Sequence, residues 1–320
     1  MSAPTGLRTA QLGSTGLEIT RVGFGAWAIG GGGYDWGWGS QVDEDSIAAI
    51  HHALELGVNW IETAAQYGFG HSEQVVGRAV AGLEPRPYVF TKGGQPEGPG
   101  RTTIQSLRRD SLLREVEGSF KRLGIDAIDL YQIHWPIPDE EIEESWATFA
   151  ELKEQGLVRH IGVSNFDISQ LRRVQAIAPV ETLQPQYSLI DRDVEKEILP
   201  FAEGEGIGVI VYSPMASGLL SGAMTRERIE ALPEDDWRRR SERFQEPQLS
   251  RNLELVERLR LVAARHDTTP GAVAIAWTLR NQAVDGAIVG FRRPGQVDPM
   301  VPAANLELDV EDIATIEGSG

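Results

Sequence analysis

Four side chains that could move a proton lie at or just beyond the ends of apolar segments. They are Glu62, Tyr67, Lys92 and His134, which supply a carboxylate, a phenol, an ammonium and an imidazole. Glu62, Lys92 and His134 each end a run that is typical of a buried strand, and Tyr67 follows the first run by five residues. Polar groups at the carboxyl ends of parallel strands commonly form active sites, so the pattern predicts proton-transfer chemistry.

Short segments of strand character position these residues and alternate with segments of helical period. The expected strands are 21–25, 58–62, 88–92, 128–134, 158–164, 181–186, 208–213 and 287–290. Eight such units in 320 residues predict an α/β fold in a single domain over residues 1–320, a (β/α)8 TIM barrel. The alternative, a doubly wound sheet, would need a Gly-x-Gly-x-x-Gly turn after its first strand. The glycine run at 30–33 lacks that context.

Two segments fall outside the repeat. Residues 8–20 predict an N-terminal hairpin that closes the bottom of the barrel. Residues 217–250 form a long, polar, charged stretch after the seventh strand, and we expect a lid-like loop there. Trp237 among the charges favours a lid that docks on the protein, and a solvated, mobile loop is the alternative.

Helix termini are also marked in the sequence. Apolar residues of helical period predict a helix over about 110–123, ended by Gly124. Asp167 with Gln170 predicts a capped helix start, and Thr269-Pro270 predicts another.

Composition limits the partners. The net charge of −17 argues against binding to nucleic acid or to anionic membranes. The absence of cysteine excludes disulfides and thiolate chemistry, and no metal site is predicted. Residues 1–6 lack the features of a signal peptide, and no apolar run approaches the roughly 20 residues that span a bilayer. We therefore expect a cytoplasmic protein.

Several motifs resemble those of the aldo-keto reductases, in the family's order along the chain. Residues 62–68, with His71-Ser72-Glu73 shortly after, resemble the first family signature, and residues 129–134 resemble the second active-site strand. The likeness continues through 156–158, 161–166, 212–214 and 288–293. It covers nearly the whole chain and implies a (β/α)8 barrel, NAD(P)H and reversible reduction of a carbonyl group.

The chemistry of the four residues agrees with this resemblance. Hydride reduction of a carbonyl leaves an alkoxide that needs a proton, and tyrosine, with a pKa near 10, is a weak acid. An ammonium about 4 Å away would lower the phenol pKa by roughly three units before desolvation, so Lys92 would make Tyr67 a general acid. His134 would orient the carbonyl oxygen, and Glu62 would hold Lys92. A purely structural alternative is a buried Lys92–Glu62 ion pair beside unrelated aromatic residues.

Glu62 departs from the family pattern, which has aspartate at this position. The leading prediction is NADPH-dependent reduction of small aldehydes or ketones, with Tyr67 as the general acid. The alternative is a nicotinamide-cofactor-binding protein with little turnover, like the reductase-like β subunits of potassium channels. A third possibility is a barrel aldolase with Lys92 as a Schiff-base nucleophile, against which the cofactor signature argues.

The resemblance also implies the cofactor contacts. Arg292 and Arg293 would meet the 2′-phosphate, since guanidinium groups suit phosphate, so NADP is expected and NAD is less favoured. The alternative for both is a surface arginine. Pro299 and Met300 depart from the glutamate and asparagine that commonly stand at the adenine. The other expected contacts are Ser164, Asn165 and Gln184 at the carboxamide, Tyr212 on the nicotinamide ring, Ser213, Ser217 and Leu219 at the pyrophosphate, and Gln296 at the adenine.

Tryptophans are expected to build the substrate pocket. Trp36 and Trp38 lie in the glycine-rich loop after the first strand, on the face where barrel enzymes bind ligands. Trp27 and Trp135 complete the expected lining, and Trp237 is a further candidate. Indole rings suit aromatic, aliphatic and sugar C–H groups alike, so the small carbonyl substrate stays open. The alternative is a loop that packs its tryptophans inward.

Overall fold

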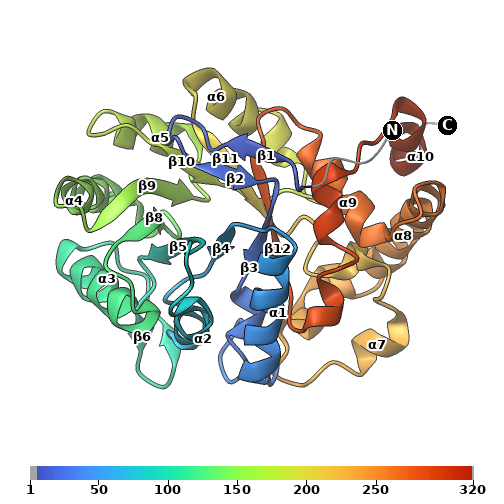
Figure 1. Cartoon of the computed structure of the whole chain (residues 1–320), viewed down its shortest axis with the longest axis horizontal. Coiled ribbons are helices and arrows are strands. Elements are labelled where there is room, and N and C mark those ends of the chain that lie inside the picture. The colour runs from blue at the N-terminus through green and yellow to red at the C-terminus, as the bar shows by residue number, and fades with distance from the viewer. Residues whose placement is uncertain (1–5, 319–320) are drawn as a thin grey trace.

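A closed barrel of parallel strands forms the centre of the computed structural model, which describes residues 6–318 (Figure 1). Residues 1–5, part of the segment expected to lack a signal peptide, and residues 319–320 lie outside the described residues. Around the barrel the strand order is β10-β11-β12-β3-β4-β5-β8-β9. These strands are β3 (Val22–Gly25), β4 (Trp60–Glu62), β5 (Tyr88–Gly93), β8 (Ile128–Ile133), β9 (Val158–Ser164), β10 (Thr182–Gln184), β11 (Gly208–Tyr212) and β12 (Gly286–Gly290). The predicted barrel is confirmed, with small shifts at the strand ends.

Helices surround the barrel (Figure 1). The predicted helix termini are confirmed. Gly124 caps the C-terminus of α3 (Arg109–Leu123) with a φ of 65°, and Asp167 and Gln170 form a capping box at the start of α5 (Ile168–Gln175). The Thr269 side chain caps the start of α9 (Pro270–Leu279). The helices are α1 (Asp43–Glu55), α2 (His71–Val80), α3 (Arg109–Leu123), α4 (Ile142–Glu154), α5 (Ile168–Gln175), α6 (Ile198–Glu205), α7 (Arg226–Glu230), α8 (Gln248–Arg265), α9 (Pro270–Leu279) and α10 (Val310–Glu317).

The predicted N-terminal hairpin consists of β1 (Thr9–Gln11) and β2 (Glu18–Thr20), which pair antiparallel. The indole N–H of Trp60, inside the barrel, donates to the Thr20 carbonyl at 2.8 Å. The hairpin and the barrel share one apolar cluster, made of Leu12, Leu17, Ile19, Trp60, Phe90, Leu130, Ile210 and Ile288. Burial of this cluster fixes the hairpin against the lower end of the barrel and leaves the other end for chemistry.

The segment 217–250 is neither structureless nor solvated along its length. It contains η4 (Leu219–Ser221), α7, η5 (Trp237–Arg240) and η6 (Glu242–Phe244). The backbone N–H of Trp237 donates to the Gly37 carbonyl at 3.1 Å, and Trp38 forms a β-bridge with Asp236. The segment is therefore docked on the glycine-rich loop, as the placement of Trp237 favours.

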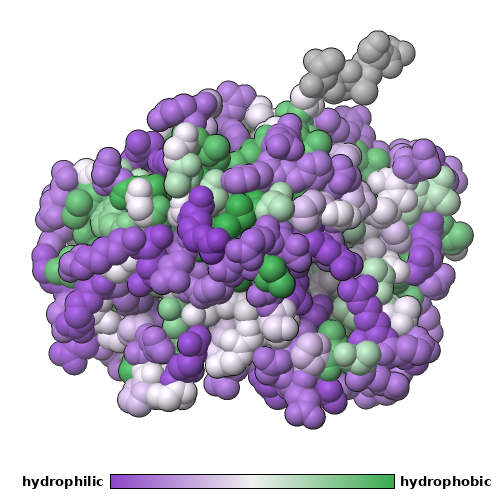
Figure 2. Space-filling model, turned by 60° about the horizontal axis from the view of Figure 1, so that its bottom comes forward, coloured by the Kyte–Doolittle hydropathy of each residue, from purple (hydrophilic) through white to green (hydrophobic). Residues whose placement is uncertain are grey.

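The face of the molecule in Figure 2 is covered mostly by hydrophilic side chains, with small apolar groups between them. The large apolar side chains lie mainly in the barrel and between the barrel and the helices. Within residues 6–318, no helix combines the length and the apolar composition that crossing a membrane requires.

Candidate active site

The four predicted proton-transfer residues meet at the carboxyl ends of neighbouring strands. Lys92, in β5, contacts the Glu62 carboxylate at the end of β4, and its Nζ donates to the Tyr67 hydroxyl at 2.9 Å. The Tyr67 hydroxyl lies 3.3 Å from Glu62 Oε1. His134, which follows β8, packs edge-on against the Tyr67 ring with 5.6 Å between ring centroids. The residues form one connected site, which favours the chemical interpretation over separate structural roles.

Burial controls the protonation of these groups. All four side chains are buried. Burial raises the pKa of Tyr67, the opposite of the lowering expected from the ammonium, because loss of water penalises the phenolate, and the neighbouring Tyr34 and Tyr212 act in the same direction. Burial and the charge of Lys92 lower the pKa of His134. At neutral pH the site therefore holds a protonated phenol and a neutral imidazole, which are suited to donate a proton and to orient an acceptor.

Burial also lowers the pKa of Lys92. The direct contact with the Glu62 carboxylate favours the charged form, and the Thr63 carbonyl accepts a further hydrogen bond from Nζ at 3.1 Å. Lys92 is thus held between two acceptors while it donates to the phenol.

A second polar group lies at the ends of β9, β10 and β11. The Tyr212 hydroxyl donates to Asn165 Oδ1 at 2.8 Å, and Asn165 Nδ2 donates to the His134 carbonyl at 3.0 Å. The Ser164 hydroxyl donates to the Gln184 carbonyl at 2.8 Å. The Gln184 Nε2 group is buried and has no partner among residues 6–318. Since buried polar groups are normally satisfied, this amide is available to a ligand with an acceptor, as a carboxamide provides.

A cavity of about 660 Å³ extends from Glu62 and Tyr67 along the β11 and β12 ends. Of the predicted cofactor contacts it is lined by Tyr212, Ser213, Ser217, Arg292, Arg293 and Gln296, whereas Ser164, Asn165 and Gln184 are not part of its lining. Leu219 is a further exception: its side chain is fully buried and its backbone N–H donates to the Ala216 carbonyl. The cavity is large enough for a sizeable part of a dinucleotide, and the polar residues in its mostly apolar lining can contact phosphate groups.

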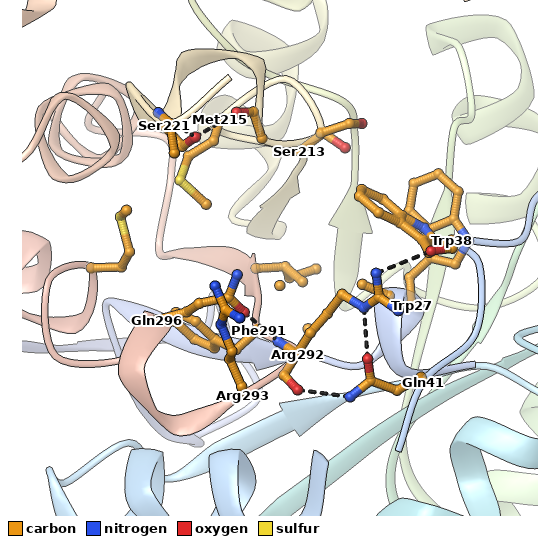
Figure 3. Close-up of a pocket in the computed structure, with 18 of the residues that line it drawn as sticks. Trp27, Trp38, Gln41, Ser213, Met215, Ser221, Phe291, Arg292, Arg293 and Gln296 are labelled. Atoms are coloured by element: carbon orange, nitrogen blue, oxygen red, sulfur yellow. Dashed lines mark hydrogen bonds between the residues drawn. The ribbon is translucent and has the colours of Figure 1, made fainter. Parts of the chain in front are cut away.

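The two adjacent arginines are not equivalent (Figure 3). Arg292 Nε donates to Gln41 Oε1 at 2.7 Å, and its Nη1 and Nη2 donate to the carbonyls of Trp38 and Ser40 at 3.0 Å and 2.5 Å. Arg293 has no side-chain hydrogen bond or ion pair with any residue of the described chain. The Arg292 guanidinium therefore anchors the glycine-rich loop, and Arg293 keeps its donors for a ligand.

Comparisons with known proteins agree with this arrangement. The family model described as "Aldo/keto reductase family" matches residues 21–320. The chain belongs to the aldo/keto reductase family.

Individual relatives of this aldo/keto reductase cover almost its full length. "Aldo-keto reductase YhdN" from Bacillus subtilis (strain 168) is 38% identical over 305 residues, covering 94% of this chain and 90% of that protein. "NADH-specific methylglyoxal reductase" from Escherichia coli (strain K12) is 34% identical over 323 residues, covering 96% of both. The solved glycerol dehydrogenase AKR11B4 from Gluconobacter oxydans is 34% identical, with a TM-score of 0.85 over 98% of this chain and 94% of that chain.

Family membership makes this chain an oxidoreductase that acts on carbonyl or alcohol groups, and enzymes of the family use nicotinamide cofactors. The aldolase alternative is thereby set aside. The unpartnered Gln184 amide, the Arg293 donors and the cavity that Arg293 lines fit such a cofactor.

Indole rings gather beside the Tyr67 end of the cavity. Trp27 stacks on Trp237 with 5.4 Å between centroids, and Trp38 meets Trp27 edge-on at 5.1 Å. Trp27 and Trp38 line the cavity. Trp36 and Trp135 do not; they are 51% and 37% exposed and lie at the protein surface. Both side chains lie in loops and are exposed, and the spacing of residues along the sequence cannot predict the direction of a loop side chain.

Sequence reasoning missed Arg238, which lines the same cavity. Its guanidinium carbon lies 4.4 Å from the centroid of the Trp38 ring, and it is paired with the fully buried carboxylate of Asp236 at 2.6 Å. The contact of Arg238 with Trp38 joins the docked segment to the glycine-rich loop. In the sequence, Arg238 begins a run of three arginines that is typical of a solvated surface.

Glu115 supports the strand that carries Lys92. Its Oε2 accepts hydrogen bonds from the backbone N–H groups of Gly94 and Gln95, at 3.1 Å and 3.2 Å, directly after β5. Burial raises the pKa of Glu115 to about 7. The folded protein therefore binds a proton here more tightly than the unfolded chain, whose glutamate titrates near 4.5.

This shift predicts a pH-dependent contribution to stability. The contribution of Glu115 is fully present below about pH 4.5 and is lost as the pH rises through about 7. Glu115→Gln keeps a carbonyl acceptor but cannot ionise. Relative to the wild type, its free energy of unfolding should therefore increase between pH 5 and pH 8, by at most about 3 kcal/mol. Denaturant unfolding of both proteins at each pH measures this. A difference that is independent of pH would contradict the shifted titration.

Proposed function

We propose that this aldo/keto reductase reduces small aldehydes or ketones with NADPH, with Tyr67 as the proton donor. The observation that carries the proposal is the connected group of Glu62, Tyr67, Lys92 and His134 at one end of the cavity. Bound NADPH supplies the hydride, and the nicotinamide would lie between Tyr212 and the carboxamide contacts Ser164, Asn165 and Gln184.

The chain's own residues position the carbonyl and protonate it. The neutral His134 ring lies against Tyr67, so both side chains can donate hydrogen bonds to the same substrate oxygen. As negative charge develops on that oxygen, the Tyr67 proton moves to it, and Lys92 stabilises the phenolate that remains. The Trp27 and Trp38 rings exclude water from one side of the site.

The direct test is NADPH consumption with a panel of aldehydes, ketones and sugars. The decrease in the absorbance of the reduced nicotinamide measures turnover for each compound. We expect steady-state turnover with at least one small carbonyl compound. Tight binding with a single round of oxidation and negligible steady-state turnover would instead support the cofactor-binding alternative.

Arg293 supports the choice of NADPH, because its side chain lines the cavity and its N–H donors form no hydrogen bond with the described residues, so they can bind the 2′-phosphate. Arg293→Ala should raise the dissociation constant of NADPH about 10–100-fold and that of NADH much less, since a charge-assisted contact is worth about 1.5–3 kcal/mol. The two dissociation constants are measured by adding each reduced cofactor to the protein and following the intrinsic fluorescence of the protein. The Escherichia coli relative is named as NADH-specific, so the cofactor preference of this chain is decided by this measurement.

Arg292→Ala is the matched control for this prediction. Its guanidinium holds Trp38, Ser40 and Gln41, so its loss should affect NADPH and NADH to a similar extent. A wild-type preference for NADH, or equal weakening of both cofactors by Arg293→Ala, would refute the assignment of the 2′-phosphate to Arg293.

Glu62 bears on the rate of the reaction. Its Oε1 lies 3.3 Å from the Tyr67 hydroxyl, so in the absence of substrate it accepts a hydrogen bond from the hydroxyl that catalysis must direct to the substrate. Glu62→Asp retracts the carboxylate and releases the phenol, and we expect kcat to increase by up to about tenfold, the equivalent of one hydrogen bond. Steady-state kinetics with the best substrate measure this. A decrease in kcat at unchanged cofactor affinity would show instead that the site is fitted to glutamate.

A further inference from the structure

A second cleft, of about 780 Å³, lies between the start of α3 and the hairpin of β6 (Glu97–Gly98) and β7 (Thr102–Thr103) (Figure 1). Among residues 6–318 it shares no lining residue with the cavity that Tyr67 and Arg293 line. Loops form one wall of the cleft and α3 forms the other. The two walls differ in chemistry, so a ligand would meet apolar groups on one side and charged groups on the other.

The loop wall is apolar. Its side chains are Ala65, Phe69, Pro96 and Ile104. The Phe69 ring is held edge-on against Tyr34, with 5.5 Å between ring centroids, and Ile104 is 42% exposed. A ligand with a ring or a branched alkyl group would remove this apolar surface from water, which is favourable.

The α3 wall carries three guanidinium groups, those of Arg108, Arg114 and Arg122. Two of them are already paired: Arg114 binds Asp110 at 3.0 Å, and Arg122 binds the fully buried Glu73 at 2.7 Å. The Arg108 side chain forms no hydrogen bond or ion pair with any residue of the described chain. Arg108 therefore keeps its N–H donors for a ligand.

A second set of unused hydrogen-bonding groups belongs to Gln95, which follows the strand that carries Lys92. Gln95 lines the cleft and is only 8% exposed, yet its side-chain amide has no hydrogen-bond partner among residues 6–318. Buried amides are normally satisfied, so this amide indicates a ligand with polar atoms. The first turn of α3 adds to the donors, because Arg108 at the N-cap has no side-chain acceptor to cap it.

The carboxyl groups of the lining do not occupy these donors. Asp110 is bound to Arg114, and Glu97 is exposed to water on β6. Glu115 accepts hydrogen bonds from two backbone N–H groups, and burial raises its pKa to about 7, so it carries only part of a negative charge at neutral pH. The free groups in the cleft are thus mainly donors, and a matching ligand must supply acceptors.

We propose that this cleft binds a small organic carboxylate, with its charged group at Arg108 and Gln95 and its apolar body against Phe69 and Ile104. Guanidinium groups match a carboxylate in geometry and charge, and the amide supplies a further donor. The apolar wall selects an acid that carries a ring or a branched alkyl group. The cleft is separate from the cavity assigned to the nicotinamide cofactor, so the proposal does not depend on the proposed function.

The test is isothermal titration calorimetry of the full-length protein with benzoate at constant ionic strength. We expect the wild type to bind benzoate with a dissociation constant of about 1 mM or lower. Benzamide has the same ring without the charge, and inorganic phosphate has the charge without the ring. Each should bind at least about tenfold more weakly than benzoate, because each lacks the contacts of one wall.

Variants locate the binding within the cleft. Arg108→Met should weaken benzoate binding about tenfold or more, and Gln95→Leu about threefold or more, as expected for a charged and a neutral hydrogen bond. Arg109→Met is the matched control, since Arg109 is the next residue, pairs with Glu151 and does not line the cleft. This control should retain the wild-type dissociation constant.

Three results would overturn the proposal. The first is absence of benzoate binding to the wild type at about 10 mM, a measurement that requires no variant to fold. The second is equally tight binding of benzamide or phosphate, which would show that the ligand class is wrong. The third is wild-type affinity in both Arg108→Met and Gln95→Leu, which would place benzoate elsewhere, for example beside Tyr67. None of these results bears on NADPH-dependent turnover, which is measured separately.

Discussion

Tyr67→Phe is expected to lower kcat for carbonyl reduction by about 10²–10⁴-fold, the usual worth of general acid catalysis, at nearly unchanged cofactor affinity. The Tyr67 hydroxyl is the group that accepts from Lys92 Nζ at 2.9 Å, and burial raises its pKa, so it carries its proton at neutral pH. Phenylalanine retains the ring that packs on Trp27 and His134 and removes only the proton donor. Steady-state reduction and cofactor titration measure the two effects separately.

Tyr34 provides the matched control. Its hydroxyl is also buried, has no hydrogen-bond partner among residues 6–318, and belongs to a side chain that is 8% exposed. Tyr34→Phe should therefore change kcat by less than about threefold, since the Tyr67 hydroxyl keeps its hydrogen bonds to Lys92 and Glu62. A loss below tenfold in Tyr67→Phe, or an equal loss in both variants, would mean that the phenolic proton of Tyr67 does not drive the reaction.

The strand pattern predicted the barrel and brought Glu62, Lys92 and His134 to one edge. The prediction of the site succeeded because parallel strands in a closed barrel direct their carboxyl ends to the same face. A polar residue at the end of each strand is therefore placed near the polar residues at the ends of the neighbouring strands. Tyr67 lies on a loop, but the short distance from β4 restricts where its hydroxyl can reach.

The loop side chains could not be predicted in the same way. Arg292 and Arg293 are neighbours with the same chemistry, and only the carbonyl groups of Trp38 and Ser40, from the opposite end of the chain, assign one of them to the loop. Arg238 is buried because Asp236 compensates its charge and Trp38 covers it. Such roles depend on contacts between distant segments, which periodicity and spacing do not encode.

The cation beside the Tyr67 hydroxyl belongs to the buried Lys92–Glu62 ion pair, and loss of either partner would leave the other as an uncompensated buried charge. Lys92→Met should lower turnover about as far as Tyr67→Phe, because the phenolate loses the cation beside it. It should also reduce the free energy of unfolding by about 3–5 kcal/mol, since Glu62 would remain as a buried charge without its partner. Kinetics and denaturant unfolding of the same preparation measure the two losses.

A second substitution separates catalysis from stability. In Lys92→Met/Glu62→Gln the uncompensated carboxylate is replaced by a neutral amide of the same shape, so most of the lost stability should return while turnover stays low. If Lys92→Met costs less than about 1 kcal/mol, the buried pair is not ionised and cannot act by charge. If the double variant recovers turnover together with stability, Lys92 serves only to compensate Glu62. Recovery of stability alone is the result that a proton-transfer role for Lys92 requires, because the phenolate must be stabilised by a cation that the apolar methionine does not supply.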